Sequence, residues 1–554
     1  MIKKTNKYIY FLAGAILGAA VFILFFGVDI ISPVNTKWIF AQHDDVTQHH
    51  VGWEFFRRSP WDFPFGLIEG ISADEKVSCM YTDSIPLFAI VFKLLSPILP
   101  DNFQYFGIWG IICYMLNGGF GALLLTRIKK NLFFTSVGSL FYSAFWPTLL
   151  RIMHHNSLGA IWLVIIPLIL TIDHDRKYKH SFTPVILWTV TCILASLIHL
   201  YFIPMIYCVM LGYMILLFFK DKKRVQAIAV FASSTFFSVL FLWIIGGFYG
   251  SGSYTDGGFG IYSANFNTFF NSKGQAKYMR QLDILDGQYE GFGYLGLGML
   301  ILCFLSVLVI VNKLSTKEGG FLKNVSAAVK SRKTEIIAFC VIFAAGFFWA
   351  ASNKLTINRS VIMTIPLPEF ILGKLGIFRS SGRFIWLPCL MTMTSVLWIC
   401  AKLNKSTLFT ALTLCIAVQF GDMQNYYTDT HAAAHRNDAY ITALSGAEWE
   451  EAANGAEEIV FLPLPDNYKS YMKLYFDFAE LACNKHMKLS SFYLARTDNS
   501  ILKAYADKKY TELKSGNGSS KYLYVFFNNE DIPVNVKGLD VKEIDGYTVA
   551  RVKK

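Results

Sequence analysis

The feature that most constrains the fold of this chain is a series of long apolar runs, separated by short loops that hold clusters of lysine and arginine. A helix crosses the hydrocarbon core of a membrane with roughly 20 apolar residues, and counting runs of that length gives about eleven crossings. Hydrophobic residues make up 54% of the 554 residues and charged residues only 16%, which is more apolar than one soluble core requires. The sequence therefore predicts a polytopic α-helical membrane protein.

The basic clusters predict how the chain is oriented. They lie at residues 127–130, 173–180, 221–224, 313–333 and 402–405. All of them fall on the side of the N-terminus if residues 85–99 do not cross, and short cytoplasmic loops carry the excess of lysine and arginine. We therefore expect a cytoplasmic N-terminus, a first apolar run (residues 8–31) that is retained as a helix, and a short proline-interrupted helix on the outer surface at residues 85–99.

The long loops then gather on the outer face. They comprise a first outer loop at 32–104, the segments 151–157, 247–292 and 352–382, and everything after residue 422. Residues 247–260 are rich in glycine, serine and tyrosine, which is typical of a mobile, lid-like segment or of an ordinary flexible loop.

Hydropathy falls after the last apolar run, which predicts two domains. We expect a multi-spanning domain at residues 1–421 and an extracytoplasmic soluble α/β domain at residues 422–554. Its expected elements are helices near 447–456 and 468–484 and strands at 458–464, 522–527 and 547–552. No glycine-rich phosphate loop follows either of the first two expected strands.

Composition also excludes several classes of function. The net charge of +12 does not indicate nucleic-acid binding, because the basic residues lie between apolar runs, where they orient the chain and meet anionic lipid headgroups. The ten cysteines are scattered without a CxxC pair, so they indicate buried small side chains and no metal site. The motifs of P-loop, HExxH and GxSxG enzymes are absent as well.

The stretch Gln42-His-Asp-Asp-Val-Thr-Gln-His-His50 places five histidine or acidic side chains directly after the first apolar run. On a helix, Asp45 and His49 share one face. That face could hold a divalent cation with Asp44 as a further ligand, or Asp45 could act as a base while His49 or Gln48 orients an acceptor hydroxyl. The alternative is an ordinary helix N-cap, which needs only one acidic residue.

Two further outer segments carry candidate residues. The turn from Arg151 to Asn156 sets His154 and His155 beside an arginine, although an arginine reaching towards the membrane interface explains this pattern equally simply. Glu290 stands at the outer mouth of an expected helix. A carboxylate there is either functional or held by the helix dipole alone.

Arg379 and Arg383 flank a small turn just outside an expected span. Guanidinium groups match the geometry of phosphate oxygens, so a pair at this depth would suit a lipid phosphate. Contact with ordinary phospholipid headgroups is the simpler alternative.

A cytoplasmic N-terminus, a large first outer loop that opens with an acidic residue, many further spans and an outward C-terminal domain together resemble the GT-C superfamily of membrane glycosyltransferases. Shorter motifs are similar to the bacterial DUF6311-type proteins. They are Asp45-x-x-Gln-His-x-x-Gly-Trp-x-Phe-Phe-Arg57, Pro60-Trp61, Thr82-Asp-Ser-Ile-Pro-Leu87, Phe103-Gln-Tyr-Phe-Gly-Ile-Trp109, Gln288-Tyr-Glu-Gly-Phe292 and Arg379-Ser-Ser-Gly-Arg-Phe384.

The superfamily resemblance implies transfer of a sugar from a polyprenyl-phosphate donor to a glycan or lipid acceptor at the outer face of the bacterial cytoplasmic membrane. It makes Asp45 the general base or a cation ligand, with His49 and Glu290 as further catalytic residues. It assigns the donor phosphate to Arg379, Arg383 and Arg151. The remaining expected cavity residues are Asp44, Gln48, His50, His154 and His155.

The resemblance is incomplete in the second outer loop. Where oligosaccharyltransferases have paired acidic residues, this chain has His154-His155-Asn156. This departure argues against a metal-dependent mechanism, and it leaves Asp44, Asp45 and His49 as the expected ligands if a divalent cation is bound.

The competing hypothesis is a non-catalytic protein, either a transporter or flippase for lipid-linked sugars or a scaffold for envelope assembly. Transporters often have inverted repeats and broken helices with polar groups at the midplane. No repeat is evident, and the ionisable residues gather at the outer rim. If the enzyme hypothesis holds, Asp45, Arg151, Glu290 and Arg379 should converge on one outward cavity.

Overall fold

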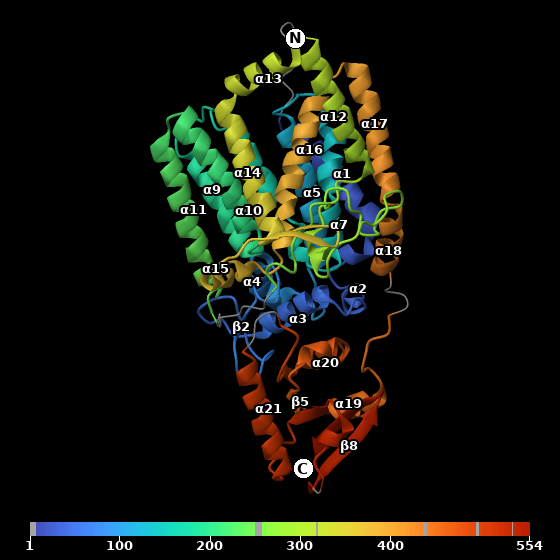
Figure 1. Cartoon of the computed structure of the whole chain (residues 1–554). Coiled ribbons are helices and arrows are strands. Elements are labelled where there is room, and N and C mark those ends of the chain that lie inside the picture. Colours follow the sequence, from blue (N-terminus) through green and yellow to red (C-terminus); the bar gives the residue numbers. More distant parts are fainter. Residues whose placement is uncertain are drawn as a thin grey trace.

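The computed structural model describes residues 7–249, 258–316, 320–435, 440–494, 498–534 and 536–553. Within these residues the chain forms a long helical bundle, and a smaller region with a sheet lies beyond one end of it (Figure 1). The proposed lid at 247–260 falls mostly on residues 250–257, which lie outside the described parts.

Seven of the described helices are long and apolar enough to cross a membrane. They are α1 (Lys7–Phe26), α5 (Phe106–Leu125), α10 (Phe202–Ile215) with its continuation Leu216–Lys220, α11 (Arg224–Ile244), α12 (Leu297–Ser315), α14 (Lys333–Ala351), and η7 (Ser381–Ile385) joined to α16 (Trp386–Cys400). An eighth span results if α17 (Lys405–Asp422) and α18 (Gln424–Ala434), which meet at 54°, are taken together. These helices indicate a membrane protein, as the apolar runs predicted.

Four apolar helices in the described chain are shorter than a full span. They are α4 with η2 (Pro86–Ile98), α6 (Leu132–Ser143), η3 with α8 (Asn156–Ile172) and α9 (Thr183–Ile198). The segment at 85–99 is indeed a short helix, α4 (Pro86–Leu95), with Pro86 in its first turn. It lies near α3 (Asp45–Arg58) at the end of the bundle that faces the sheet (Figure 1).

The remaining elements of the bundle are short. The helices are η1 (Asp29–Ile31), α2 (Lys37–Phe40), α7 (Trp146–Ile152), η5 (Gln288–Gly291), α13 (Gly320–Ser331), α15 (Glu369–Leu375) and η6 (Gly376–Phe378). Two antiparallel hairpins pair β1 (Leu67–Ile68) with β2 (Val77–Ser78) and β3 (Lys354–Ile357) with β4 (Ser360–Thr364).

Small residues bring α1 and α5 into close contact. A Cβ atom on Gly14 would lie 2.3 Å from the Gly118 carbonyl oxygen, and one on Gly18 would lie 2.0 Å from that of Tyr114. Such close backbone approach is typical of helix pairs in membranes, where van der Waals packing replaces the hydrophobic effect as the main force between helices.

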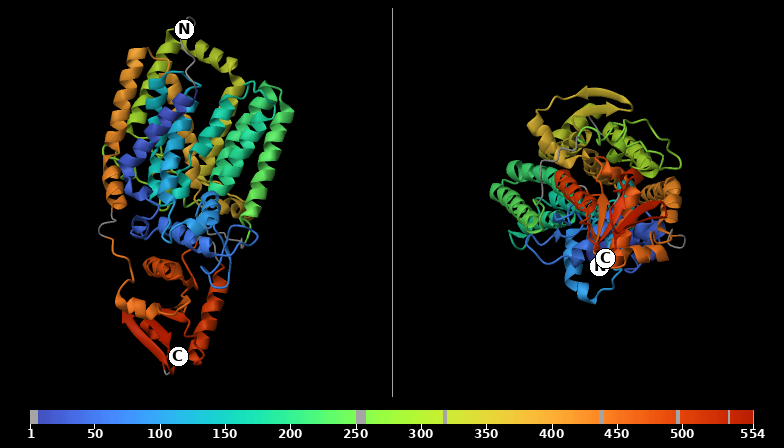
Figure 2. Two further views of the ribbon diagram at one scale, coloured as in Figure 1. Left: turned by 180° about the vertical axis from the view of Figure 1, so that it is seen from behind. Right: turned by 90° about the horizontal axis from the view of Figure 1, so that it is seen from below.

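The expected basic loops meet at the end of the bundle that holds the N-terminus. Arg127 and Lys130 line one cavity together with Lys7 and Arg176. The described chain begins at this end, whereas the C-terminus lies at the other (Figures 1 and 2). The basic clusters and the C-terminal region are therefore on opposite ends of the bundle.

The C-terminal region is a mixed α/β unit. Its five strands follow the order β6-β5-β7-β9-β8, in which β5 is parallel to β6 and β7, and β9 is antiparallel to β7 and β8. The strands are β5 (Glu458–Leu462), β6 (Lys488–Leu489), β7 (Tyr522–Phe526), β8 (Leu539–Ile544) and β9 (Tyr547–Val552), and the helices are α19 (Ala447–Ala453), η9 (Tyr468–Ser470), α20 (Met472–Lys485), α21 (Asn499–Lys514) and η10 (Asn529–Asp531). The expected strands and helices are present, and α21, β6 and β8 are additional.

This C-terminal region docks directly onto the first loop of the bundle (Figure 2). The Gln48 side chain donates a hydrogen bond to the Tyr493 carbonyl, and His43 Nε2 lies 2.9 Å from Asp477 Oδ1. Arg58 donates to the carbonyl of Cys483 on α20. The docking surface thus borders the helix that carries Asp45 and His49.

Candidate functional site

Helix α3 begins in the acidic and histidine-rich stretch. Asp44 is its N-cap: the carboxylate accepts a hydrogen bond from the Asp45 amide, and Thr47 completes a capping box. The simple structural role weighed for this stretch therefore belongs to Asp44. Asp45, one residue later, is left partly exposed on the first turn of the helix.

The side chains of this stretch have different surroundings in the structure. Gln48 is committed to the C-terminal region, as described above. His50 does not line the expected cavity, because its ring packs in an apolar setting against Phe40 and Phe106. Burial, together with the charges of Arg58 and Arg57, lowers the pKa of His50 to about 3, so the ring is neutral.

His49 lies one turn after Asp45 on the same face of α3 and is fully buried. Neither of its ring nitrogens has a hydrogen-bond partner among the described residues, and its ring stacks on that of His155 at 5.9 Å. Burial lowers the pKa of His49 to about 4 despite the nearby Asp83 carboxylate. A neutral, buried and unpartnered imidazole is an unusual feature that the packing of the helix does not explain.

Asp83 reaches the same place from the turn before α4. Ser84 Oγ donates to the His49 carbonyl at 2.8 Å, which fixes this turn against α3. Gly52 permits the contact, because a Cβ there would lie 2.4 Å from Thr82 Cβ. Asp83 itself has a φ of 49°, a left-handed conformation that aspartate tolerates better than most residues.

Histidines surround the Asp83 carboxylate. Its Oδ2 lies 3.8 Å from His49 Nε2 and 3.5 Å from His155 Nδ1, while its Oδ1 lies 3.5 Å from His199 Nε2. Burial alone would raise the pKa of Asp83, but His199 and His155 hold it well below its usual value. Sequence reasoning quoted Asp83 only within a family motif and did not identify His199 as a site residue.

The histidines of the predicted outer segment 151–157 pair with the acidic residues at the start of α3. His155 Nε2 lies 3.1 Å from Asp45 Oδ2, and His154 Nδ1 lies 2.5 Å from Asp44 Oδ2. Both histidines follow α7, and Trp109 donates to the Asn156 carbonyl just beyond them. The predicted acidic residues and the predicted histidines are therefore direct partners.

Glu290 is the centre of a second, buried cluster. Arg383 donates to both carboxylate oxygens at 2.8 Å, and Arg151 Nη2 donates to Oε2 at 2.9 Å. Burial alone would raise the pKa of Glu290, but Arg383 and Arg151 hold it well below its usual value. Two guanidinium groups thus face one carboxylate, which leaves the trio with one net positive charge.

The loop before α12 positions Glu290 through amide side chains. Gln288 donates to Ser263 Oγ and Thr356 Oγ1, and Asn265 donates to Gln288 in turn. Lys273 donates to the Gln288 carbonyl as well, and burial lowers the pKa of this lysine to about 7. Sequence reasoning did not find Lys273, because nothing in a glycine-rich loop sequence shows which lysine folds inward.

Both clusters meet at one cavity of about 150 Å³. Asp83, His155 and His199 line one part of it, and Arg379 and Arg383 line another. Arg383 also lies over the ring of Tyr201, 4.9 Å from its centre. The predicted arginine pair therefore splits: Arg383 is bound to Glu290, whereas Arg379 is exposed beside the cavity.

These positions change the roles expected of several residues. Arg151 and Arg383 were expected to hold a phosphate, but their guanidinium groups are engaged by Glu290, which the sequence presented as a catalytic carboxylate. The expected cation ligands Asp44 and Asp45 point to His154 and His155 instead. Of the three expected cation ligands, only His49 lies in a group of side chains whose ligand atoms are close enough to share a metal ion.

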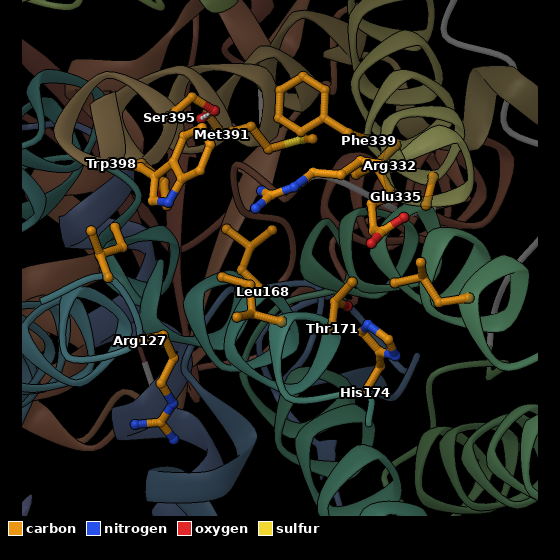
Figure 3. A pocket seen from close by; sticks show the side chains of 16 residues that line it. Arg127, Leu168, Thr171, His174, Arg332, Glu335, Phe339, Met391, Ser395 and Trp398 are labelled. Carbon is orange, nitrogen blue, oxygen red and sulfur yellow. Dashed lines mark hydrogen bonds between the residues drawn. The ribbon is translucent and has the colours of Figure 1, made fainter. Parts of the chain in front are cut away.

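A larger cavity of about 390 Å³ lies at the opposite ends of α14 and α16, with mostly apolar walls (Figure 3). Its charged residues are largely paired: Arg127 with Asp173, His174 with Asp221, and Glu335 with Lys220. In Figure 3 the Arg332 side chain extends into this space beside Trp398. It lacks the convergent unpaired groups of the site around Asp83 and His155.

Comparison with known proteins assigns both regions of the chain. The family model of the domain of unknown function DUF6311 matches residues 15–424, and that of the DUF6311 C-terminal domain matches residues 448–552. No curated protein matches the chain. The first match alone spans well over half of the sequence and contains every residue of the site described above. The chain therefore belongs to the DUF6311 family.

Proposed function

We propose that this protein is a membrane glycosyltransferase of the GT-C type, which moves a sugar from a polyprenyl-phosphate donor to a glycan or lipid acceptor of the bacterial cell envelope. The observation that carries the proposal is convergence. Asp45, Arg151, Glu290 and Arg379 come from four segments that are far apart in the sequence. Asp45 pairs with His155, and Glu290 pairs with Arg151 and Arg383. His155, Arg383 and Arg379 in turn line one cavity.

In the proposed topology the site lies at the outer, extracytoplasmic face of the cytoplasmic membrane. The basic loops gather with the N-terminus at one end of the bundle, and the site and the C-terminal region lie at the other, as the excess of positive charge in cytoplasmic loops requires. In this proposal α6, α8 and α9 cross together with the eight longer spans, which gives about eleven crossings in total.

Within the site, Asp45 acts as the general base. One of its oxygens is bound to His155, and its partial exposure leaves the carboxylate accessible to an acceptor hydroxyl. A positioned base of this kind contributes about 10²- to 10⁴-fold to a rate. Arg379, exposed at the cavity, binds the donor phosphate, and the net positive trio of Arg151, Glu290 and Arg383 stabilises the charge of the departing lipid phosphate.

A transporter or scaffold fits the same arrangement less well. A transport route needs polar groups along the length of the bundle. Here Arg379, Arg383 and the residues around Asp83 line a cavity at one end of the bundle, and a separate set of basic residues lines a cavity at the end with the N-terminus. The described cavity between α14 and α16 has mostly apolar walls. An enzyme that works at one membrane surface needs only the first of these features.

The test is sugar transfer from a radiolabelled polyprenyl-phosphate sugar by the full chain in lipid vesicles. Asp45→Asn should lower the transfer rate by at least about 100-fold. Asp466→Asn is the matched control, since this carboxylate is 92% exposed in the C-terminal region and should leave the rate unchanged. Undiminished transfer by Asp45→Asn would overturn the proposed role, and flux of intact donor across the vesicle without transfer would favour the transporter.

A further inference from the structure

The fully buried His49 side chain needs a partner that the described protein does not supply. Both ring nitrogens lack a hydrogen-bond partner among the described residues, and so does Nδ1 of His155. A neutral imidazole has one nitrogen that donates and one that accepts, and burying either of them without a partner carries a desolvation penalty. Two unpaired nitrogens on His49, beside one on the stacked ring of His155, indicate a ligand that these two side chains share.

The spacing of the surrounding atoms points to a cation. One ligand atom from each of His49, Asp83 and His155 lies within 4.8 Å of the others. The distances of 3.8 Å and 3.5 Å from Asp83 Oδ2 to the two rings are too long for good hydrogen bonds. They are close to the roughly 3.4 Å that separates two ligands bound tetrahedrally to one zinc ion at about 2.0–2.1 Å.

The outer partners of these three residues have the arrangement that metal sites use. Metal-bound histidine usually donates its other ring N–H to a carboxylate, which fixes the ring and its tautomer. His155 has this geometry: Nδ1 faces Asp83, and Nε2 lies 3.1 Å from Asp45 Oδ2. Asp45 thereby orients a ligand, in addition to its proposed role as a base.

His199 supports the Asp83 carboxylate from the other side. Its Nδ1 accepts a hydrogen bond from the Tyr201 amide at 3.1 Å, so in the neutral ring Nε2 carries the proton. Nε2 lies 3.5 Å from Asp83 Oδ1, within ion-pair distance, which leaves Oδ2 for His49 and His155. His199 is accordingly a positioning residue and no ligand.

We infer that His49, Asp83 and His155 form a binding site for a divalent transition-metal cation, with Zn²⁺ as the first candidate. Two imidazoles and one carboxylate suit zinc and its neighbours, whereas Mg²⁺ and Ca²⁺ prefer oxygen ligands alone. Three protein ligands leave a coordination position open, as in catalytic zinc sites. Asp83 and His155 also line the cavity beside Arg379, so a phosphate oxygen could reach the cation from there.

The test measures metal binding alone and needs no donor or acceptor. The full chain, carried on a tag without histidine, is stripped with a chelator in detergent and titrated with Co²⁺, whose visible absorption reports coordination by nitrogen and oxygen. Zinc content after dialysis is measured by mass spectrometry. The wild-type chain should bind one cation that Zn²⁺ displaces.

Two adjacent histidines provide the matched pair of variants. His155→Asn should abolish the cobalt spectrum, while His154→Asn should keep it, because His154 contacts Asp44 outside the ligand set. Asp45→Asn should weaken binding by roughly 10- to 100-fold, as the loss of an outer partner does. Asp83→Asn removes a ligand and leaves every histidine in place. Its cation affinity tests the site if His155→Asn does not fold.

Two results would overturn the inference: no cobalt or zinc bound at one equivalent by the wild-type chain, or equal affinity in Asp83→Asn and wild type. The outcome is separable from that of the proposed function. Cation binding without sugar transfer would support the metal site and contradict the proposed glycosyltransferase activity. Sugar transfer by a chain that binds no cation would support the activity and contradict the metal site.

Discussion

Arg383 donates one hydrogen bond to each oxygen of the Glu290 carboxylate, both at 2.8 Å. Arg151 donates a further hydrogen bond to Oε2. All three groups are largely withdrawn from water. Removing one member of such a buried set costs far more than the set contributes when complete, because the remaining charges have no partner.

Glu290→Gln should therefore destabilise the chain by about 3–5 kcal/mol, since it leaves two buried guanidinium groups opposite a neutral amide. Thermal unfolding in detergent measures this. Glu69→Gln is the control, because that glutamate pairs with Lys76 at the surface and its loss should cost about 0–1 kcal/mol. Equal melting temperatures for the two variants would mean that the arginines find water or other partners.

Gly382→Ala should separate Glu290 from Arg383 by steric means. A Cβ on Gly382 would lie 2.6 Å from both the nitrogen and Cα of Gly291, and backbone atoms cannot swing aside as a flexible side chain can. We expect a loss of about 1–3 kcal/mol of stability, as in other overpacked sites. Gly376→Ala, with nothing within 4 Å of its added Cβ, should change the melting temperature little.

How much of the fold the sequence could predict depended on the strength of each local pattern. Long apolar runs located the spanning helices, and the prolines near residue 85 predicted the short α4. Helix α21 was not foreseen, although Leu502, Ala506 and Leu513 recur at helical spacing, because its many lysines resemble an exposed linker. The half-exposed edge strand β8 has three charged residues among its six, so its alternation of apolar and polar residues is weak.

The site was predictable only where several ionisable residues are neighbours in sequence. Asp45, Arg151 and Arg379 were found because each lies beside other ionisable residues in the sequence, and Glu290 because it stands at the mouth of an expected helix. Asp83 and Lys273 were missed, since each is a single ionisable residue whose role depends on a turn folding onto a distant helix or loop. The pairing of Glu290 with both arginines likewise required three segments to meet, which no local pattern records.

His43→Ala should loosen the C-terminal region from α3. His43 Nε2 lies 2.9 Å from Asp477 Oδ1, and Asp477 is almost fully buried, so its charge depends on such partners. A hydrogen bond to a charged group contributes about 1.5–3 kcal/mol, so amide hydrogen exchange in α20 should accelerate by roughly 10-fold or more. His180→Ala, at an exposed position, should leave the exchange of α20 unchanged.

Unchanged exchange in His43→Ala would show that the Gln48 and Arg58 contacts hold the region on their own. The double variant Gln48→Ala/His43→Ala then separates the two explanations. Faster exchange only in the double variant would assign the docking to the contacts as a group.

Glu480→Gln should remove a pH dependence of stability in the C-terminal region. Burial raises the pKa of Glu480 to about 7, although the hydroxyl of Tyr440 and the amide of Ala443 donate to its carboxylate. An unfolded glutamate titrates near 4.5. Between these two values the folded state binds more protons than the unfolded state, so stability falls as the pH rises from about 4.5 to about 7, by roughly 3 kcal/mol at most.

The amide that replaces the Glu480 carboxyl cannot ionise and still accepts from Tyr440, so the Glu480→Gln variant should match the wild type at pH 4.5 and exceed it in stability above pH 7. Hydrogen exchange of α20, corrected for the intrinsic rate at each pH, measures the difference. Glu457→Gln is the control, because that carboxylate is 65% exposed beside Lys521 and should give the wild-type profile. A wild-type profile that does not fall between pH 4.5 and 7 would mean that water reaches Glu480 and keeps its carboxyl solvated.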